Sequence, residues 1–199
     1  AGKNTLGQEA IIQRRGRDMV RPVEERYRAV RDLFPELRIE LVNGRIVVNE
    51  PGTWQHNTII AQLLAQLAPL VAERGWEIWP NITVHLDEET DRYVPDLTIV
   101  PREPAMATDQ AVRGTSTLLL VDVVSAGNAY DDHVVKPMGY APAGVPLYLV
   151  VDPFQQLLKL HSEPEPSGYA RETVEPVGAP LPLPDPWDCL IDTSGLLRI

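Results

Sequence analysis

The segment that most constrains the fold is Thr117–Ser125, which reads TLLLVDVVS. It is apolar through most of its length, as is typical of a strand buried on both faces of a sheet. Its one charged residue, Asp122, has apolar neighbours on both sides. An isolated buried charge is very unfavourable, so such a carboxylate must be paired, hydrogen-bonded or metal-bound unless it reaches solvent at a strand end. The segment therefore predicts a layered fold with a covered central strand.

The rest of the chain alternates helices and strands. Asn43-Gly44, a type I′ turn dipeptide, predicts a hairpin with strands near 37–42 and 45–49. Apolar residues at helical spacing predict a long helix between an N-cap at Thr53 and a stop at Gly75. Further elements are expected as a helix from Pro22, a short helix at about 135–143, and strands within 76–100 and 147–161. We predict an α+β (mixed α/β) fold: one central mixed sheet flanked by helices, with an N-terminal helix plus β-hairpin.

Three parts are expected along the chain. Residues 1–20 are polar and Arg-rich, which predicts a mobile N-terminal arm, and 21–162 form the main domain. Residues 163–199 form an acidic, Pro-rich C-terminal extension packed on the same domain, irregular apart from at most one strand pair. The N-terminus does not resemble a signal peptide, the longest apolar stretch is too short for a membrane span, and Cys189 is the single cysteine. We expect a cytoplasmic protein with no membrane association.

The charge balance limits how the chain could bind nucleic acid. With 28 acidic and 18 basic residues the formal net charge is −10, which argues against coating DNA through a broad basic surface. The first 50 residues hold ten bases and eight acids, and the remainder holds eight bases and twenty acids. The N-terminal part is therefore the expected place for contacts with phosphate.

Three acids lie in predicted strands: Glu40, Asp96 and Asp122. If two or three of them meet at one end of the sheet, their oxygens suit Mg²⁺ or Mn²⁺. Such an ion polarises a phosphoryl oxygen and activates water. The alternatives are a solvent-facing strand start for Asp96, which follows Pro95, and the wet face of the hairpin for Glu40.

Six short pieces follow one another in order: ELVNG, His56 before the long helix, Pro95-Asp96, DVVS, DDHVVK and YAPAGVPLYLVVD. Together they resemble the putative restriction endonuclease family, a domain-of-unknown-function group of the PD-(D/E)XK nuclease superfamily. The family pattern is roughly E-L-x-x-G, H, P-D, E-V-x-S, D-x-x-x-K and Y-x-x-A-G-V-x-x-Y-x-x-V-D. The resemblance spans about residues 38–160.

The resemblance implies a restriction-endonuclease-like core and Mg²⁺-dependent (or Mn²⁺-dependent) hydrolysis of DNA phosphodiesters. By position it implies that Asp96 and Asp122 are metal ligands, that Glu40 helps to hold a second ion, and that Lys136 orients water and offsets charge on the phosphate. His56 matches the family histidine, with helix capping or solvent exposure as its alternative. Nucleases of this type commonly act as pairs, so a homodimer is expected.

The match departs from the family pattern at two places. Asp122 stands where the family usually has Glu, and Val124 stands where the superfamily lysine would be, which moves the lysine role to Lys136. Pro137 follows at once, so the helix is expected to begin near Lys136 and to be short. Lys136 could instead be a surface partner of Asp132 at i,i+4. The run 131–133 is expected to be a solvated turn, because adjacent side chains diverge.

Three functions remain open from the sequence. The first is a metal-dependent DNA endonuclease. The second is a catalytically decayed nuclease fold that serves as a binding or assembly module, favoured by the departures at Asp122 and Pro137. The third is a structural protein whose acids bind Ca²⁺ incidentally. Convergence of Asp96, Asp122 and Glu40 would favour the first, and an arginine on Asp122 the second.

Overall fold

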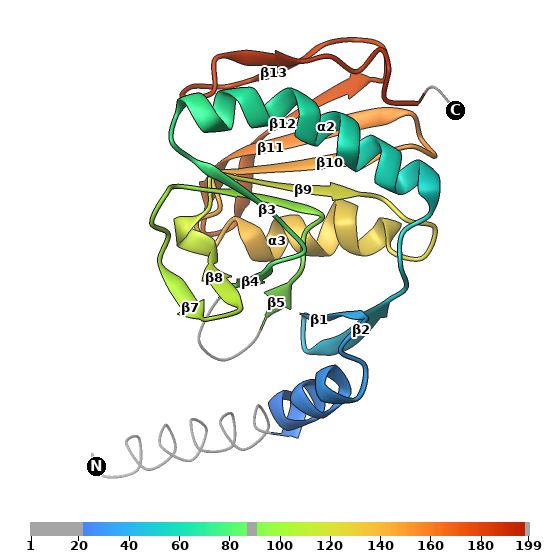
Figure 1. Cartoon of the computed structure of the whole chain (residues 1–199), viewed down its shortest axis with the longest axis vertical. Helices are drawn as coiled ribbons and strands as arrows, with labels where there is room; N and C mark the ends of the chain where they lie inside the picture. Colours follow the sequence, from blue (N-terminus) through green and yellow to red (C-terminus); the bar gives the residue numbers. More distant parts are fainter. Residues whose placement is uncertain (1–21, 87–90, 198–199) are drawn as a thin grey trace, which may run out of the picture.

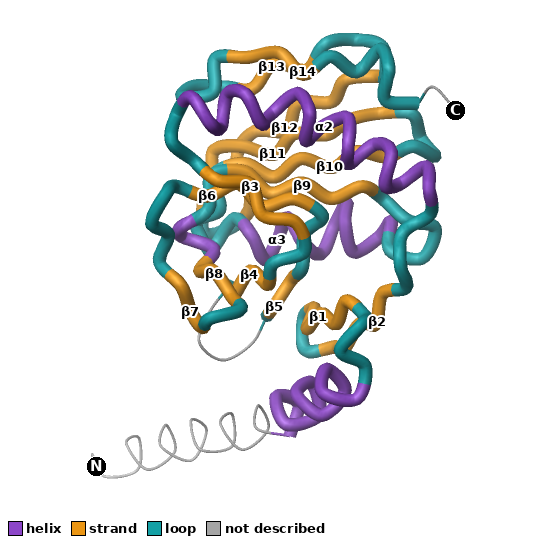
Figure 2. Tube along the Cα trace, viewed as in Figure 1, coloured by secondary structure: helices purple, strands orange, loops and turns teal. Residues whose placement is uncertain are grey.

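The computed structural model of the chain describes residues 22–86 and 91–197. The predicted N-terminal arm, residues 1–20, lies outside the described residues. Within them, the strands form two six-stranded sheets and one two-stranded ribbon. Helices lie on both faces of one of the six-stranded sheets (Figures 1 and 2).

The central sheet has the strand order β12-β11-β10-β9-β6-β3. Strands β9 and β10 are parallel and the other pairs are antiparallel, so the sheet is mixed, as predicted. Every residue of β9 is buried, which confirms the covered central strand. The strands are β3 (Glu77–Pro80), β6 (Leu97–Val100), β9 (Leu119–Val123), β10 (Leu147–Asp152), β11 (Leu157–Glu165) and β12 (Gly168–Pro176).

The second sheet, in the order β2-β1-β5-β4-β8-β7, contains the predicted hairpin. Asn43 and Gly44 have positive φ angles of 47° and 72°, as a type I′ turn requires. We predicted one sheet, but four short strands on either side of β6, between residues 83 and 113, pair with the hairpin and with each other. The strands are β1 (Arg38–Val42), β2 (Arg45–Asn49), β4 (Thr83–His85), β5 (Arg92–Tyr93), β7 (Met106–Thr108) and β8 (Ala111–Arg113).

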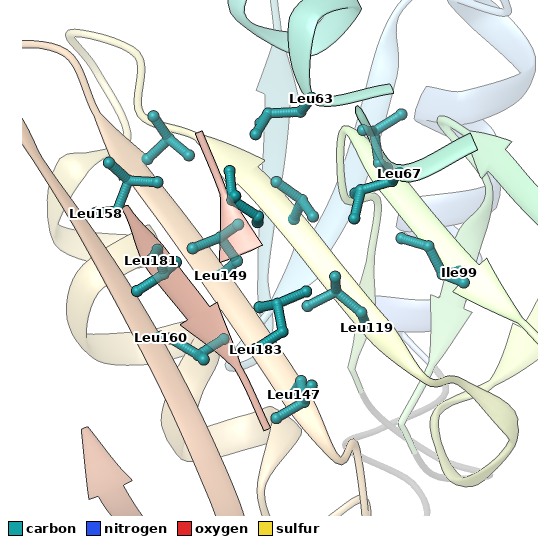
Figure 3. Close-up of a cluster of buried hydrophobic side chains, with 14 of the residues drawn as sticks. Leu63, Leu67, Ile99, Leu119, Leu147, Leu149, Leu158, Leu160, Leu181 and Leu183 are labelled. Carbon is teal, nitrogen blue, oxygen red and sulfur yellow. The ribbon is translucent and has the colours of Figure 1, made fainter. Parts of the chain in front are cut away.

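Helix α2 (Trp54–Glu73) covers one face of the central sheet. Thr53 caps it, its side chain accepting a hydrogen bond from the backbone N–H of His56, and Gly75 follows with a φ of 68°. The ribbon β13 (Leu181–Leu183) and β14 (Cys189–Ile191) covers the same face. Leucines from α2 and from β13 meet the leucines of the central strands in one apolar core (Figure 3).

The opposite face is covered by one helical segment, residues 129–140, that our prediction placed wrongly. It contains a π-helical turn, Asp131–Val135, followed by α3 (Lys136–Tyr140). The N–H of Lys136 donates to the carbonyl of Asp131, five residues back. Pro137 lacks an N–H, and its ring would clash with a regular preceding turn. The wider π-helical turn avoids this clash, so the helical segment continues past the proline. The helix therefore begins before Lys136, not at it.

The C-terminal part is more regular than predicted. Strands β11 and β12 form an antiparallel pair of nine-residue strands and β13 pairs with β14, where we expected an irregular segment after residue 162 with at most one strand pair. Pro164 of β11 lies beyond Ser162, the last residue of this strand that pairs with β10, and Pro176 ends the edge strand β12, so neither proline interrupts hydrogen bonds on both sides. None of the described helices is long and apolar enough to cross a membrane.

Candidate active site

The two aspartates of the predicted site lie at the same end of two neighbouring strands, Asp96 just before β6 and Asp122 within β9. Strands β6 and β9 are antiparallel with Leu97 opposite Val121, so Asp96, one residue earlier, comes opposite Asp122. The backbone N–H of Val123 donates to Asp96 Oδ2 at 2.8 Å, which holds this carboxylate at the end of β9. Side chains at opposed cross-strand positions are neighbours, and like charges there repel. The pair therefore needs a cation nearby.

Two basic side chains contact Asp96. Arg38 Nη1 donates to Oδ1 at 2.6 Å, and His56 Nε2 lies 3.2 Å from Oδ2. The imidazole reaches the site because Thr53 fixes the first turn of α2, and its Nε2 also lies 3.1 Å from the Val123 carbonyl. Burial would raise the pKa of Asp96, but the His56 hydrogen bond and the Arg38 charge lower it overall. The expectation that His56 only caps the helix or faces solvent is wrong.

Lys136 lies at the centre of the site, with 2% of its side chain exposed. Its Nζ is 3.0 Å from Asp122 Oδ2, 2.9 Å from Asp132 Oδ1 and 3.5 Å from a Glu40 oxygen. Burial would lower the pKa of Lys136, but these carboxylates raise it well above its usual value. The i,i+4 pair with Asp132 exists, yet it is buried, so the interpretation of Lys136 as a surface residue is wrong.

Glu40 lies in the hairpin and borders the site. It is buried in β1, where its Oε1 accepts from the backbone N–H of Val94 at 2.7 Å and its Oε2 accepts from Asn49 Nδ2 at 2.8 Å. It therefore does not lie on a wet face of the hairpin. Both oxygens have partners, so binding a metal ion would require Glu40 to give up at least one of these bonds. Its role as a metal ligand stays a prediction.

Three residues of the site were missed in the sequence: Arg38, Asp132 and Tyr148. The Tyr148 hydroxyl lies 3.0 Å from Asp122 Oδ2 and 3.2 Å from the Asp132 carbonyl. The D-x-x-x-K spacing could have revealed Asp132, because it places this carboxylate one helical turn before the lysine.

The expected solvated turn at 131–133 is only partly observed. The three side chains diverge as predicted: Asp131 binds Arg45, and His133 Nε2 lies 2.7 Å from Asp152 Oδ2. However, Asp132 between them is buried. The segment is helical and covers the central sheet, and Asp132 lies on its buried face.

The site holds more acid than base. Burial raises the pKa of Asp122 to about 7; the charge of Lys136 opposes this shift, and the neighbouring carboxylates, first among them Asp132, reinforce it. Burial likewise raises the pKa of Asp132, and Lys136 opposes it. The ionisable groups that meet here are the acids Glu40, Asp96, Asp122 and Asp132 and the bases Arg38, His56 and Lys136. A further cation would relieve the remaining negative charge.

The donor set suits Mg²⁺ or Mn²⁺ in part. In the described ranges, no three His, Cys, Asp or Glu side chains are grouped as a metal site. Mg²⁺, however, is usually held by one or two carboxylates, with water and substrate phosphate as its other ligands. Asp96 and Asp122 supply such a pair of carboxylates. An ion there would compete with Arg38 for Asp96 and with Lys136 for Asp122.

Comparisons with known proteins agree with this architecture. The family model described as "Uma2: Putative restriction endonuclease" matches residues 24–189. A crystal structure of a putative nuclease belonging to DUF820 from Anabaena variabilis ATCC 29413 is similar, with a TM-score of 0.63 and 12% sequence identity over 79% of this chain and 88% of that one. No curated protein matches the chain. At this identity the structural likeness concerns the fold alone, and it confirms the predicted mixed α+β, restriction-endonuclease-like class.

Proposed function

The chain belongs to the Uma2 family of putative restriction endonucleases, and from this membership we propose that it is a Mg²⁺-dependent (or Mn²⁺-dependent) endonuclease that hydrolyses phosphodiester bonds in DNA. The observation that carries the proposal is the opposition of Asp96 and Asp122 on adjacent strands, with Lys136 Nζ 3.0 Å from Asp122. Two carboxylates and one ammonium group, buried together, are the groups that this hydrolysis needs.

Each residue has a defined part in the proposed reaction. Asp96 and Asp122 would hold the ion, which when bound polarises a phosphoryl oxygen and lowers the pKa of a water molecule. Lys136 would orient the attacking water and offset the negative charge that develops on the phosphate. Tyr148 positions Asp122 by a hydrogen bond, and Glu40 lies 3.5 Å from the lysine Nζ and helps to fix it.

The second candidate is a decayed nuclease fold that acts as a binding or assembly module. The specific observation in its favour is the 2.6 Å bond between Arg38 and Asp96, which places an internal cation where a metal ion would bind. An arginine bound to Asp122 would have favoured this second candidate. The arginine is found on the neighbouring carboxylate instead, and Asp122 pairs with Lys136.

Plasmid cleavage tests the proposal. Supercoiled DNA would be incubated with Mg²⁺ or Mn²⁺ and with wild type, Asp96→Asn, Asp122→Asn, or Asp188→Asn, an exposed aspartate on the C-terminal segment that serves as the matched control. We expect nicking by wild type and the control, and loss of on the order of 100-fold in the two site variants. Equal activity in all four would contradict the site assignment. No activity in any, without metal binding by calorimetry, would favour the binding module.

The remaining parts of the proposal concern assembly and location. One active site of this kind cuts one strand, so cleavage of both strands of a duplex would require two copies, and we propose a homodimer. We also propose a cytoplasmic location, because the proposed substrate is DNA. The net charge of −10 makes binding to DNA weak and dependent on metal ions.

A further inference from the structure

An acidic nuclease must bind its substrate with few phosphate contacts. The net charge is −10, and the basic side chains at the site are already paired: Arg38 with Asp96, Arg45 with Asp131, and Lys136 with buried acids. At the site itself, counterion release therefore supplies little affinity, and contacts with phosphate are left to the N-terminal part of the chain. If the proposed function holds, uncharged contacts must supply much of the binding free energy.

Three aromatic side chains stand out by their exposure. Trp54 is 61% exposed, Tyr130 68% and Phe154 65%. Rings of this size bury large areas when they find a partner, and they are enriched where proteins bind ligands. No fold requirement explains them, because their exposed rings contribute little to the core.

All three belong to segments that border the candidate site. Trp54 begins α2 two residues before His56, which contacts Asp96. Tyr130 precedes the buried Asp132 by two residues in the helical segment. The backbone N–H of Phe154 donates to Asp152, whose other oxygen contacts His133 in the π-helical turn.

The same three segments gather at one end of the central sheet. The start of α2, the segment that follows β9 and the turn that follows β10 lie together there (Figure 1). Contacts between them support this arrangement, because His56 reaches the Val123 carbonyl and the N–H of Val124 donates to the Val151 carbonyl. This is also the end of the sheet at which Asp96 and Asp122 lie.

We propose that Trp54, Tyr130 and Phe154 form a base-stacking rim around the site, and that the preferred substrate is DNA with unpaired bases. Bases of a single strand expose their faces to aromatic rings, whereas the bases of a duplex are already stacked on each other. Stacking needs no positive charge on the protein and tolerates any sequence. It therefore accounts for how a chain with this acidic surface binds DNA. This inference rests on the proposed function and names its substrate class.

Binding of a fluorescent single-stranded oligodeoxynucleotide and of its duplex tests the inference. Anisotropy would be measured with Ca²⁺ in place of Mg²⁺, and a gel would confirm that the DNA stays intact. The variants are Trp54→Ala, Tyr130→Ala and Phe154→Ala, singly and combined. The matched control replaces three exposed apolar residues elsewhere by Ala: Leu33, Val174 and Leu190.

We expect wild type to bind the single strand more tightly than the duplex and with a shallow salt dependence. Each ring removed should weaken binding by roughly 5-fold or more, and the triple variant by on the order of 100-fold. Trp54→Phe keeps a ring and should retain most of the affinity. In wild type, quenching of tryptophan fluorescence by DNA should depend on Trp54, so Trp54→Phe should remove it. The control should bind as wild type does.

Several outcomes would overturn the inference. These are tighter binding to the duplex, undiminished binding by the triple variant, or an equal loss in the control. A change in oligomeric state of the triple variant by light scattering, with DNA binding intact, would show instead that the rings contact another protein chain. If single strands bind through the rings but are not cleaved with Mg²⁺ or Mn²⁺, the proposed nuclease function fails while the stacking rim is upheld. Cleavage that is lost in Asp96→Asn but unaffected in the triple variant would uphold the nuclease and refute the rim.

Discussion

Lys136→Met removes the ammonium group that three buried carboxylates share, and keeps a side chain of similar length. In the folded protein its Nζ lies within 3.5 Å of oxygens of Asp122, Asp132 and Glu40. Removing one partner of a buried ion pair typically costs about 3–5 kcal/mol, because the other charge stays buried without compensation. The variant therefore tests directly whether the lysine holds the site together.

The structure narrows the expected magnitude. Glu40 keeps the hydrogen bonds from Val94 and Asn49, so of the three carboxylates it loses the least stabilisation. Asp122, whose pKa burial raises to about 7, can take up a proton instead of staying charged. We therefore expect a loss of about 3 kcal/mol in the free energy of unfolding at about pH 8. The loss should shrink towards pH 5, because carboxylates with raised pKa values are protonated in the folded state there.

Urea unfolding followed by tryptophan fluorescence and circular dichroism measures this difference. Lys159→Met is the matched control, since Lys159 pairs with the half-exposed Glu172 at 3.3 Å near the surface and should contribute about 0–1 kcal/mol. In the double variant with Asp122→Asn, part of the loss should be recovered. A loss below about 1 kcal/mol, or one independent of pH, would refute the idea that Lys136 compensates buried charge.

Three further predictions concern single residues. Arg38→Met should raise the affinity for Mn²⁺ by at least about tenfold in calorimetry, because it frees Asp96 from a competing cation; weaker binding would show that Arg38 positions this ligand. Gly52→Ala places a methyl group 2.5 Å from His56 Nδ1, so the imidazole must move, and DNA cleavage should fall by on the order of 10-fold with little change in melting temperature. Burial lowers the pKa of His161 to about 4, so the unfolded chain binds more protons, and stability should fall by about 2 kcal/mol as the pH drops from about 6.5 to 4. His161→Phe should remove that slope, and an unchanged slope would assign it to other groups.

The sequence predicted well where neighbouring residues decide the structure. Asn43-Gly44 supplies the positive φ angles of the hairpin turn, and the helical spacing of apolar residues with Thr53 as cap gave α2 almost to the residue. The apolar run around Asp122 identified the buried central strand. The start of the helix around Pro137 was predicted wrongly. The local rule for proline places a helix start there, whereas in the folded chain a π-helical turn accommodates the proline inside a longer helical segment.

The candidate site shows what needed the tertiary structure. The sequence alone named the acids Asp96, Asp122 and Glu40 and the base Lys136 as candidates, but it could not say which side chains meet. Arg38 and Asp96 are 58 residues apart, and their contact depends on how the hairpin packs against the central sheet. For Asp132, the contact with Lys136 is local, one helical turn along the same segment, but its burial depends on how that segment packs against the central sheet. Local propensity fixes elements because its forces act over a few residues, whereas charge compensation in a buried site depends on strand order and packing, which only the folded chain decides.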